Sequence, residues 1–419
     1  MMVTSRSEVG GQRSERSRRV RCVPLLAVAV LTAVSAHAVQ AQPTVVPDSQ
    51  ALTVYLMTMG PGDAVWERFG HNAIGIRNTR AGEDRVYNWG MFSLDDSGFI
   101  LRFLRGRMRY WMASEDAALT VEVYRRYNRS VTIQELNLTA AQKTALYDFV
   151  RRNELPENRF YDYDYFRDNC STRVRDALDV ALGGVLGARF KSQSTDLTYR
   201  DHARRLMQPD IWTYTGIDIG LGRPTDRPLS AWEEMFIPMS VQRLVRDVVV
   251  TNGEGSEAPL VLREHVLFEA TRQPVPDRPA SWTLYYLLAG LLLAALILTT
   301  GLTRAAPVGI FITVVWCVVS GILGSLLVFL WVFSNHTAAY QNANLLTFNP
   351  VWLVLGVLVL ARARRARALA AVLTAAAFAG LLLWLLPNKQ DTARVLALSL
   401  PVHTAAMLAI ARRARLSRT

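Results

Sequence analysis

Five long apolar stretches in the last third of the chain constrain its fold more than any other feature. They are rich in Leu, Val and Ala and cover about residues 282–303, 307–333, 345–361, 368–387 and 395–411. Each is long enough, or nearly so, to cross a hydrocarbon core of about 30 Å as a helix. Residues 282–411 are therefore predicted to form an all-α transmembrane bundle of about five helices.

The arginines give this bundle an orientation. If residues 42–281 lie outside, nine arginines fall in the inner segments, at Arg304, in 362–367 and in the tail 412–419, against one lysine and one arginine in the outer loops. Inner segments of membrane proteins carry this excess of positive charge. The basic tail is therefore expected on the cytoplasmic side.

The first residues have the pattern of an export signal. Residues 1–21 are polar with six arginines, residues 23–36 are almost entirely apolar, and small-residue cleavage sites end at Ala38 or Ala41. This order is typical of a secretory signal peptide, which we assign to residues 1–41. Cys22 precedes the apolar run, so lipidation of the chain itself is not predicted.

The net charge does not indicate nucleic acid binding. The chain has a formal charge of +12, of which residues 1–21 carry +4 and residues 304–419 carry +10, leaving −2 for the middle. Basic charge thus follows the membrane topology, and no basic face is predicted for a phosphate backbone.

Residues 42–272 are predicted to be one soluble domain that mixes strands and helices. Strand-like segments cover 51–60, 71–78 and 84–92, and a helix runs from a Thr139 cap to about Arg152. A second helix is expected to begin at Cys170, with Asp168 or Asn169 as its cap. The Pro-rich segment 273–281 is predicted to link this α+β domain to the membrane.

Cys170 is the candidate nucleophile. With Cys22 in the leader and Cys317 in the membrane, it has no partner for a disulfide in an oxidising compartment. A thiol in the first helical turn faces unpaired amides and the positive end of the helix dipole, which favour the thiolate and can hold an oxyanion, with Asn169 and Ser171 as support. The alternative is a small buried hydrophobe.

His71 is the candidate general base for this thiol. It stands at the start of a predicted strand, where a rigid element can aim the imidazole, whereas His202 is predicted on the surface of an arginine-rich helix and His265 is a weaker candidate. Asn88, with Tyr87 as the alternative, is the candidate for holding the ring. A structural histidine in a core or turn remains the other interpretation of His71.

Metal and cofactor sites are not predicted. Asp162, Asp164 and Asp168 alternate with tyrosines but lack the glycine and distal glutamate of a calcium loop. One cysteine with scattered histidines does not make a zinc site.

Four segments together carry a resemblance to a known family. GHNAIGI, VYNWGMF, FLRGRMRYWM and YDYDYFRDNCSTRVRDAL resemble the Lnb-type lipoprotein N-acyltransferases. The resemblance implies a circularly permuted papain-like (NlpC-like) periplasmic domain, in which the histidine precedes the cysteine. It extends into the membrane half, where residues 334–350 are similar to a family loop rich in His and Asn.

The resemblance implies an activity. Cys170 would take an acyl chain from a phospholipid as a thioester, with His71 as base, and pass it to the N-terminal amine of a lipoprotein. The protein would be a multi-pass protein of the bacterial inner membrane. Four polar residues of the loop could complete the roof of the active site, bind headgroups or form a polar cap of the loop: His336, Asn342, Asn344 and Asn349.

Two other functions stay open from the sequence. One is a cysteine amidase or peptidase acting on cell-wall peptide, as in other NlpC-like domains, although a single anchoring helix would suffice for it. The other is a non-catalytic membrane scaffold.

Overall fold

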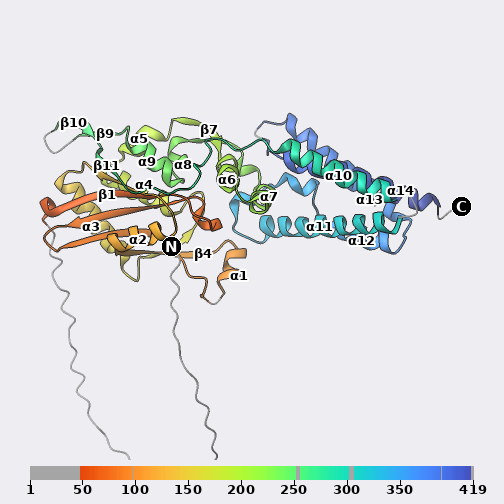
Figure 1. The fold of residues 1–419 in the computed structure, drawn as a ribbon, viewed down its shortest axis with the longest axis horizontal. Coiled ribbons are helices and arrows are strands. Elements are labelled where there is room, and N and C mark those ends of the chain that lie inside the picture. The colour runs from red at the N-terminus through yellow and green to blue at the C-terminus, as the bar shows by residue number, and fades with distance from the viewer. Residues whose placement is uncertain (1–47, 97, 252–254, 302–305, 388, 417–419) are drawn as a thin grey trace, which may run out of the picture.

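The computed structural model describes residues 48–416 except 97, 252–254, 302–305 and 388. The predicted signal peptide, with Cys22, lies outside the described residues. Two parts follow one another along the long axis, a sheet domain and a bundle of apolar helices (Figure 1). The α+β class of the first part and the helical class of the second are as predicted.

The sheet domain is built on seven strands, each antiparallel to its neighbours. Their order is β11-β5-β1-β2-β3-β4-β6. The bounds are β1 Leu52–Met59, β2 His71–Asn78, β3 Glu83–Met91, β4 Met108–Asp116, β5 Val131–Leu136, β6 Phe160–Tyr163 and β11 Val261–Phe268. The first three match the strand-like segments predicted from sequence.

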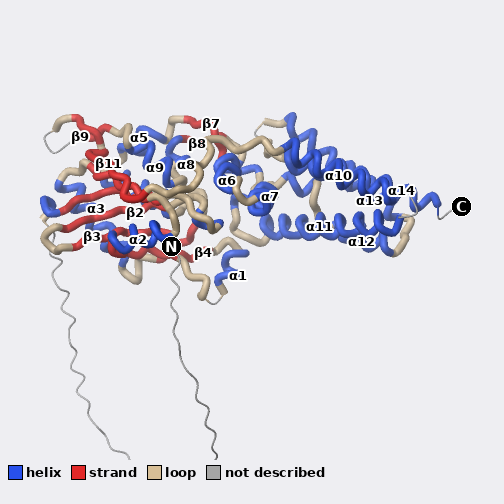
Figure 2. The backbone as a smooth tube through the Cα atoms, in the orientation of Figure 1, coloured by secondary structure: helices blue, strands red, loops and turns tan. Residues whose placement is uncertain are grey.

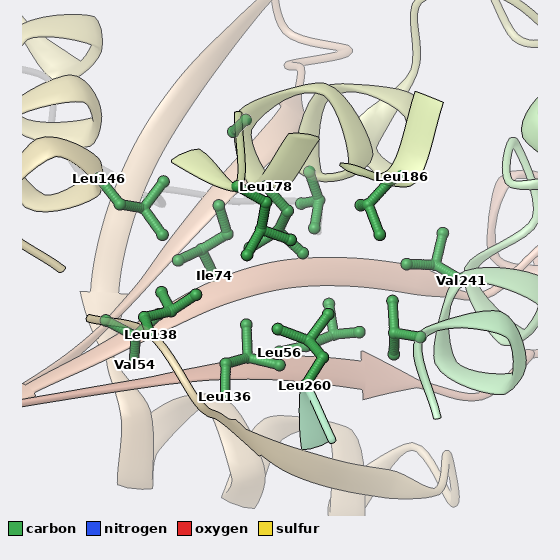
Figure 3. Close-up of a cluster of buried hydrophobic side chains, with 14 of the residues drawn as sticks. Val54, Leu56, Ile74, Leu136, Leu138, Leu146, Leu178, Leu186, Val241 and Leu260 are labelled. Carbon is green, nitrogen blue, oxygen red and sulfur yellow. The ribbon is translucent and has the colours of Figure 1, made fainter. Parts of the chain in front are cut away.

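Helices cover both faces of this sheet. Alternate strand residues face opposite sides, so Ile74 packs towards α4 (Cys170–Ala181) and α3 (Ala140–Glu154), while Ala73 packs towards α2 (Ala117–Arg126). Figure 3 shows Leu146 and Leu178 meeting the strand side chains in the larger of these cores. Burying each such leucine stabilises the fold by about 1.5–3 kcal/mol.

Shorter elements complete the sheet domain. Their bounds are α1 Phe99–Leu104, α5 Val185–Phe190, β7 Ser194–Thr198, α6 Tyr199–Met207, α7 Ile211–Gly220, β8 Pro228–Ser230, α8 Ala231–Glu234, α9 Pro238–Val245, β9 Val249–Thr251 and β10 Glu257–Pro259. The predicted linker 273–281 has no helix or strand and follows the domain surface, where Arg205 donates to the carbonyl of Pro276 at 3.3 Å (Figure 2).

Among its described residues, the second part contains five helices that are long and apolar enough to span a membrane, as predicted. Its helices are α10 Thr283–Gly301, α11 Ala306–Val332, α12 Val351–Leu360, α13 Arg365–Leu382 and α14 Ala393–Leu416. The apolar span that includes α12 begins at Ala343, in the short 3-10 turn before it.

The two parts are joined through the loops that were predicted to lie outside. Asn342, in the loop between α11 and α12, donates to the carbonyls of Ile219 and Gly220 at the end of α7, at 2.9 and 3.0 Å. In the loop before α14, Asp391 forms an ion pair of 2.5 Å with Arg204 of α6. Both loops therefore lie on the same side as the sheet domain, in agreement with the predicted alternation.

Candidate active site

Cys170 is the first residue of α4, as predicted, and Asn169 is the cap that places it there. The Asn169 side chain accepts hydrogen bonds from the backbone N–H groups of Ser171 and Thr172, both at 2.9 Å. Its amide nitrogen donates to the carbonyls of Tyr165 and Phe236 at 3.0 and 2.9 Å. The helix start is thus fixed both locally and by a distant segment, and Asn169 serves as a support.

The Cys170 thiol is half-buried and faces a bend in β3. The pairing of β3 with β4 shifts register between Asn88 and Met91, and Gly90 in this bulge has φ +89°. A Cβ atom on Gly90 would lie 3.4 Å from the Cys170 Cβ. Glycine at this position therefore lets the strand turn against the cysteine without crowding it.

His71 begins β2, and Asn88 of β3 holds its ring. Ala73 pairs with Asn88, so His71, two residues earlier on the same face, is the diagonal neighbour of Asn88. The His71 Nε2 and Asn88 Oδ1 atoms are 3.0 Å apart. The predicted alternative, Tyr87, points to the other face, where it packs in the core with α4.

A second hydrogen bond fixes the tautomer of His71. Asn88 Nδ2 donates to the carbonyl of Val86 at 3.1 Å, so its Oδ1 is the atom that faces the imidazole. An amide oxygen only accepts, and Nε2 must therefore carry the proton. The lone pair of Nδ1 is left for a proton transfer.

The cysteine and the histidine are connected through Asn72. The pairing of β2 with β3 ends at Ala73, and the Asn72 backbone N–H instead donates to the Cys170 sulfur. The residue that binds the sulfur is thus the immediate neighbour of His71. No hydrogen bond joins the imidazole to the thiol among the described residues, and such bonds often form only when substrate binds.

Burial determines the charge of both groups. It raises the pKa of the Cys170 thiol, although the backbone N–H groups of Asn72 and Ser171 act in the opposite direction. Burial also lowers the pKa of His71 to about 3. The start of the helix was predicted to favour the thiolate, and these amides do act in that direction, but loss of water around the sulfur outweighs them. At neutral pH these shifts keep the thiol protonated and the imidazole neutral.

Ser171 and Asn72 form a buried polar network below the cysteine. The Ser171 hydroxyl donates to the Met235 carbonyl at 2.7 Å and accepts from Asn72 Nδ2 at 3.2 Å. The Asn72 amide oxygen accepts from Thr58 at 2.9 Å. Ser171 is therefore a support, and its backbone N–H already binds Asn169. The Cys170 N–H has no hydrogen-bond partner among the described residues and is the better candidate for holding an oxyanion.

Sequence reasoning missed three residues of this site: Asn72, Gly90 and Tyr163. Asn72 alone had a signal, since it is a polar residue at an inward position of an otherwise apolar strand. Gly90 and Tyr163 depend on how distant segments meet, with Tyr163 Cε2 3.8 Å from the Cβ position of Gly90.

The two other candidate bases are placed elsewhere. His202 is fully buried, with Nδ1 accepting from Arg205 at 3.0 Å and its ring 5.6 Å from that of Phe236. The prediction that it lies on a surface is wrong because this face of α6 packs into a second core. His265 is exposed on the edge strand β11.

His336 in the outer membrane loop binds two segments of the sheet domain. Its Nε2 donates to the carbonyl of Phe103 at 2.7 Å, and its Nδ1 accepts from the hydroxyl of Tyr165 at 3.1 Å. Burial lowers its pKa. Since Tyr165 in turn binds Asn169, this loop is connected to the cap of the cysteine helix.

The three asparagines of the loop have different positions. Asn342 and Asn344 are buried and donate to the carbonyls that end α7, including Ile219 for both. Asn349 accepts from the Val351 N–H at 3.1 Å and lies just before α12. The structure does not bring these residues to Cys170. Asn342 also lines a cavity of about 370 Å³ between the loop and the outer ends of α11 and α13, together with Arg223 and Lys389.

The residues that the structure describes contain no group of three or more His, Cys, Asp or Glu side chains that could hold a metal ion. The candidate site thus consists of a thiol, an imidazole and the amides around them.

The fold and the site define a membrane protein in which a five-helix bundle carries an α+β domain with a cysteine and a histidine at one end of its sheet. Residues 40–205 match the family model of the Lnb N-terminal periplasmic domain, and residues 281–415 match that of the Lnb transmembrane domain. The chain belongs to the Lnb family. No curated protein and no solved structure gives a significant match.

Proposed function

We propose that this protein is a thiol acyltransferase of the bacterial inner membrane, which moves an acyl chain from a phospholipid to the N-terminal amine of lipoproteins. The observation that carries the proposal is the His71 ring, held by Asn88 as the Nε2–H tautomer, next to the residue whose N–H binds the Cys170 sulfur. Membership of the Lnb family and the position of the domain beside the outer loops support it.

In the first half-reaction, His71 Nδ1 takes the thiol proton as the sulfur attacks the ester carbonyl of the phospholipid. A sulfur–carbon bond forms, the ester carbon–oxygen bond breaks, and the imidazolium returns the proton to the departing lysophospholipid oxygen. The free Cys170 N–H is placed to stabilise the oxyanion. The product is a thioester on Cys170.

In the second half-reaction, the amine of the lipoprotein attacks the thioester. A nitrogen–carbon bond forms, the carbon–sulfur bond breaks, and His71 carries the amine proton to the sulfur. The neutral imidazole is the form that can accept a proton in each step, and burial keeps His71 in this form at neutral pH. The bilayer holds both substrates near the site, which raises their effective concentration.

The test is the mass of the full-length protein in phospholipid vesicles. Wild type should gain one acyl chain that hydroxylamine removes, Cys170→Ala should gain none, and His71→Ala should acylate about 10²–10⁴-fold more slowly. Cys317→Ala, which removes the other free cysteine described, is the matched control and should behave as wild type.

Lipoproteins from a strain without the gene should in addition lose their N-linked acyl chain. An unchanged lipoprotein mass together with altered peptidoglycan fragments would instead indicate the amidase function. An acyl chain retained by Cys170→Ala would contradict the proposal.

A further inference from the structure

The helix α1 exposes an unusual amount of apolar surface for a segment outside the membrane spans. Ile100, Leu101 and Phe103 are 73%, 52% and 44% exposed, and Leu104 is 39% exposed. Single exposed apolar side chains are common on soluble domains, but four within six residues form a continuous patch, which marks an interaction surface.

Contacts with the bundle place this patch at the level of the outer membrane surface. The Phe103 carbonyl accepts from His336, and the Arg105 carbonyl accepts from the Asn335 N–H at 2.9 Å. Gly106, with φ +67°, lies so close that an added Cβ would be 2.8 Å from the His336 backbone nitrogen. Figure 1 shows α1 on the side of the sheet domain that faces α11. The patch is therefore held next to the outer end of a membrane span.

Basic residues accompany the apolar ones. Arg105 and Arg107 are exposed directly after the helix, and Arg102 lies within it in an ion pair with Asp96. Apolar side chains beside arginines are typical of segments that lie in the headgroup region of a bilayer. This charge favours a phospholipid surface over a second protein as the partner.

A row of aromatic rings leads from this helix to the cysteine. Successive ring centroids are 6.3 Å apart for Phe103 and Phe99, 5.9 Å for Phe99 and Phe92, 5.1 Å for Phe92 and Tyr110, and 4.3 Å for Tyr110 and Tyr163. Tyr163 ends the row beside Gly90, which itself borders Cys170. The rings therefore form one packed apolar row from α1 to the thiol, with Phe92 and Tyr110 buried in its middle.

We propose that α1 inserts into the outer leaflet and that the aromatic row guides the acyl chain of a phospholipid to Cys170. This inference rests on the proposed acyl transfer and adds the route of the donor. A chain that leaves the bilayer loses its apolar surroundings, and aromatic side chains along the way keep its methylene groups out of water. With the ester carbonyl at the sulfur, the apolar tail would lie along the aromatic row towards the bilayer.

The experiment uses the full-length protein in vesicles of phosphatidylethanolamine and phosphatidylglycerol, with p-nitrophenyl butyrate as a second, water-soluble donor. The double variant Ile100→Asp with Leu101→Asp should form the Cys170 acyl-enzyme from the vesicle lipids about tenfold more slowly or worse. With the soluble ester it should remain within about twofold of wild type, since the thiol and imidazole are untouched.

The matched control is Leu262→Asp with Val266→Asp, two residues that are 52% and 60% exposed on β11 at the opposite edge of the sheet. This variant should acylate like wild type from both donors. Phe99→Ala tests the aromatic row separately. Wild type should acylate faster with p-nitrophenyl octanoate than with p-nitrophenyl butyrate, and Phe99→Ala should lose this preference.

Each other outcome has a distinct meaning. Wild-type rates of the α1 variant from vesicle lipids would overturn the inference and leave the proposed function standing. Equal loss with both donors would also overturn it, because α1 would then shape the site itself. Normal acyl-enzyme formation with slow transfer to a lipopeptide would show that the patch binds the acceptor. If wild type accepted an acyl chain from neither donor, the proposed function would fail first.

Discussion

At the scale of single residues, the candidate site depends on two asparagines, of which Asn88 acts through its side-chain amide and Asn72 through its backbone N–H. Asn88 sets the tautomer of His71 through a pair of hydrogen bonds, and Asn72 connects the strand of the histidine to the sulfur. Neither amide takes or gives a proton. Both are positioning residues, and their effect is measurable through the groups that they hold.

Replacing Asn88 should therefore change both the rate and its pH dependence. Asn88→Ala frees the ring and should slow acylation of Cys170 about 10–100-fold. Asn88→Asp places a carboxylate on Nε2, which raises the pKa of His71, so the acid limb of the pH–rate profile should move to higher pH. The control is Asn137→Ala, which removes a hydrogen bond from an asparagine side chain to the Pro259 carbonyl in another part of the domain. An unshifted limb in Asn88→Asp would mean that His71 is not the base.

Buried histidines also make the stability of the protein depend on pH. The pKa values of His71 and His202 are lowered by burial to about 3, whereas unfolded histidine titrates near 6.5. The unfolded chain then takes up protons between these values and the folded protein does not, so stability falls as pH is lowered through 6.5. Each histidine should cost about 2 kcal/mol between pH 7 and pH 5.

Thermal unfolding in detergent at the two pH values measures this loss. His202→Gln should reduce the difference in unfolding free energy between pH 7 and pH 5 by about 2 kcal/mol. Substitution of the exposed His265 should leave this difference unchanged. An equally steep decline in His202→Gln would refute the assignment.

At the scale of elements, the site lies where a helix start meets the bulged end of a strand. The Asn169 cap fixes the first turn of α4, and the register shift after Asn88 turns β3 away from β2. This divergence frees the Asn72 N–H from the ladder, so that it can bind the sulfur. The start of α4 and the bulge in β3 thus leave the space that the Cys170 thiol occupies.

Gly90→Ala tests the role of the bulge in β3. Its φ of +89° makes any side chain unfavourable by about 1–2 kcal/mol, and the new Cβ would face Cys170 at 3.4 Å. Gly82→Ala is a matched control, because its φ is +65° and nothing lies within 4 Å of its Cβ position. Both variants should lose similar stability by chemical unfolding. Only Gly90→Ala should also alkylate slowly with iodoacetamide at Cys170, and equal alkylation rates would argue against this geometry.

At the scale of the whole molecule, the periplasmic domain is held firmly on the bundle. Arg200 and Arg204 share the buried carboxylate of Asp218, and Arg204 continues to Asp391 of the membrane loop. Breaking one partner of a buried ion network leaves an unpaired charge and is strongly unfavourable. A fixed height above the membrane follows, which the proposed acyl transfer between membrane-bound substrates would require.

One methyl group added at Gly222 should disturb the contact between the sheet domain and the membrane loops. Gly222 donates to the Ala338 carbonyl at 2.7 Å, and a Cβ on it would overlap the Tyr340 carbonyl oxygen. Gly222→Ala should therefore lower the unfolding temperature and expose residues 273–281 to limited proteolysis. Gly220→Ala, two residues away with open space at its Cβ, should not. Identical protease sensitivity of the two variants would show that the parts are not in tight contact.

The sequence by itself determined the five membrane spans, the strand that begins at His71 and the helix that begins at Cys170. These features depend on local signals, namely the length of apolar runs, the alternation of side chains and an asparagine cap, which act within a few residues. The His336 loop was identified as polar and external for the same reason. The separate contacts of its four residues come only from the tertiary structure: Asn349 lies just before α12, while His336, Asn342 and Asn344 contact the sheet domain.

Only the tertiary structure decided the register that places Asn88 on His71, the hydrogen bond from Asn72 to the sulfur and the burial that keeps the thiol protonated. Each depends on contacts between segments far apart in the chain, such as α4 with β2 and β3. Burial in particular is a property of the assembled fold, and here it reversed the charge state that the start of the helix favours when considered alone.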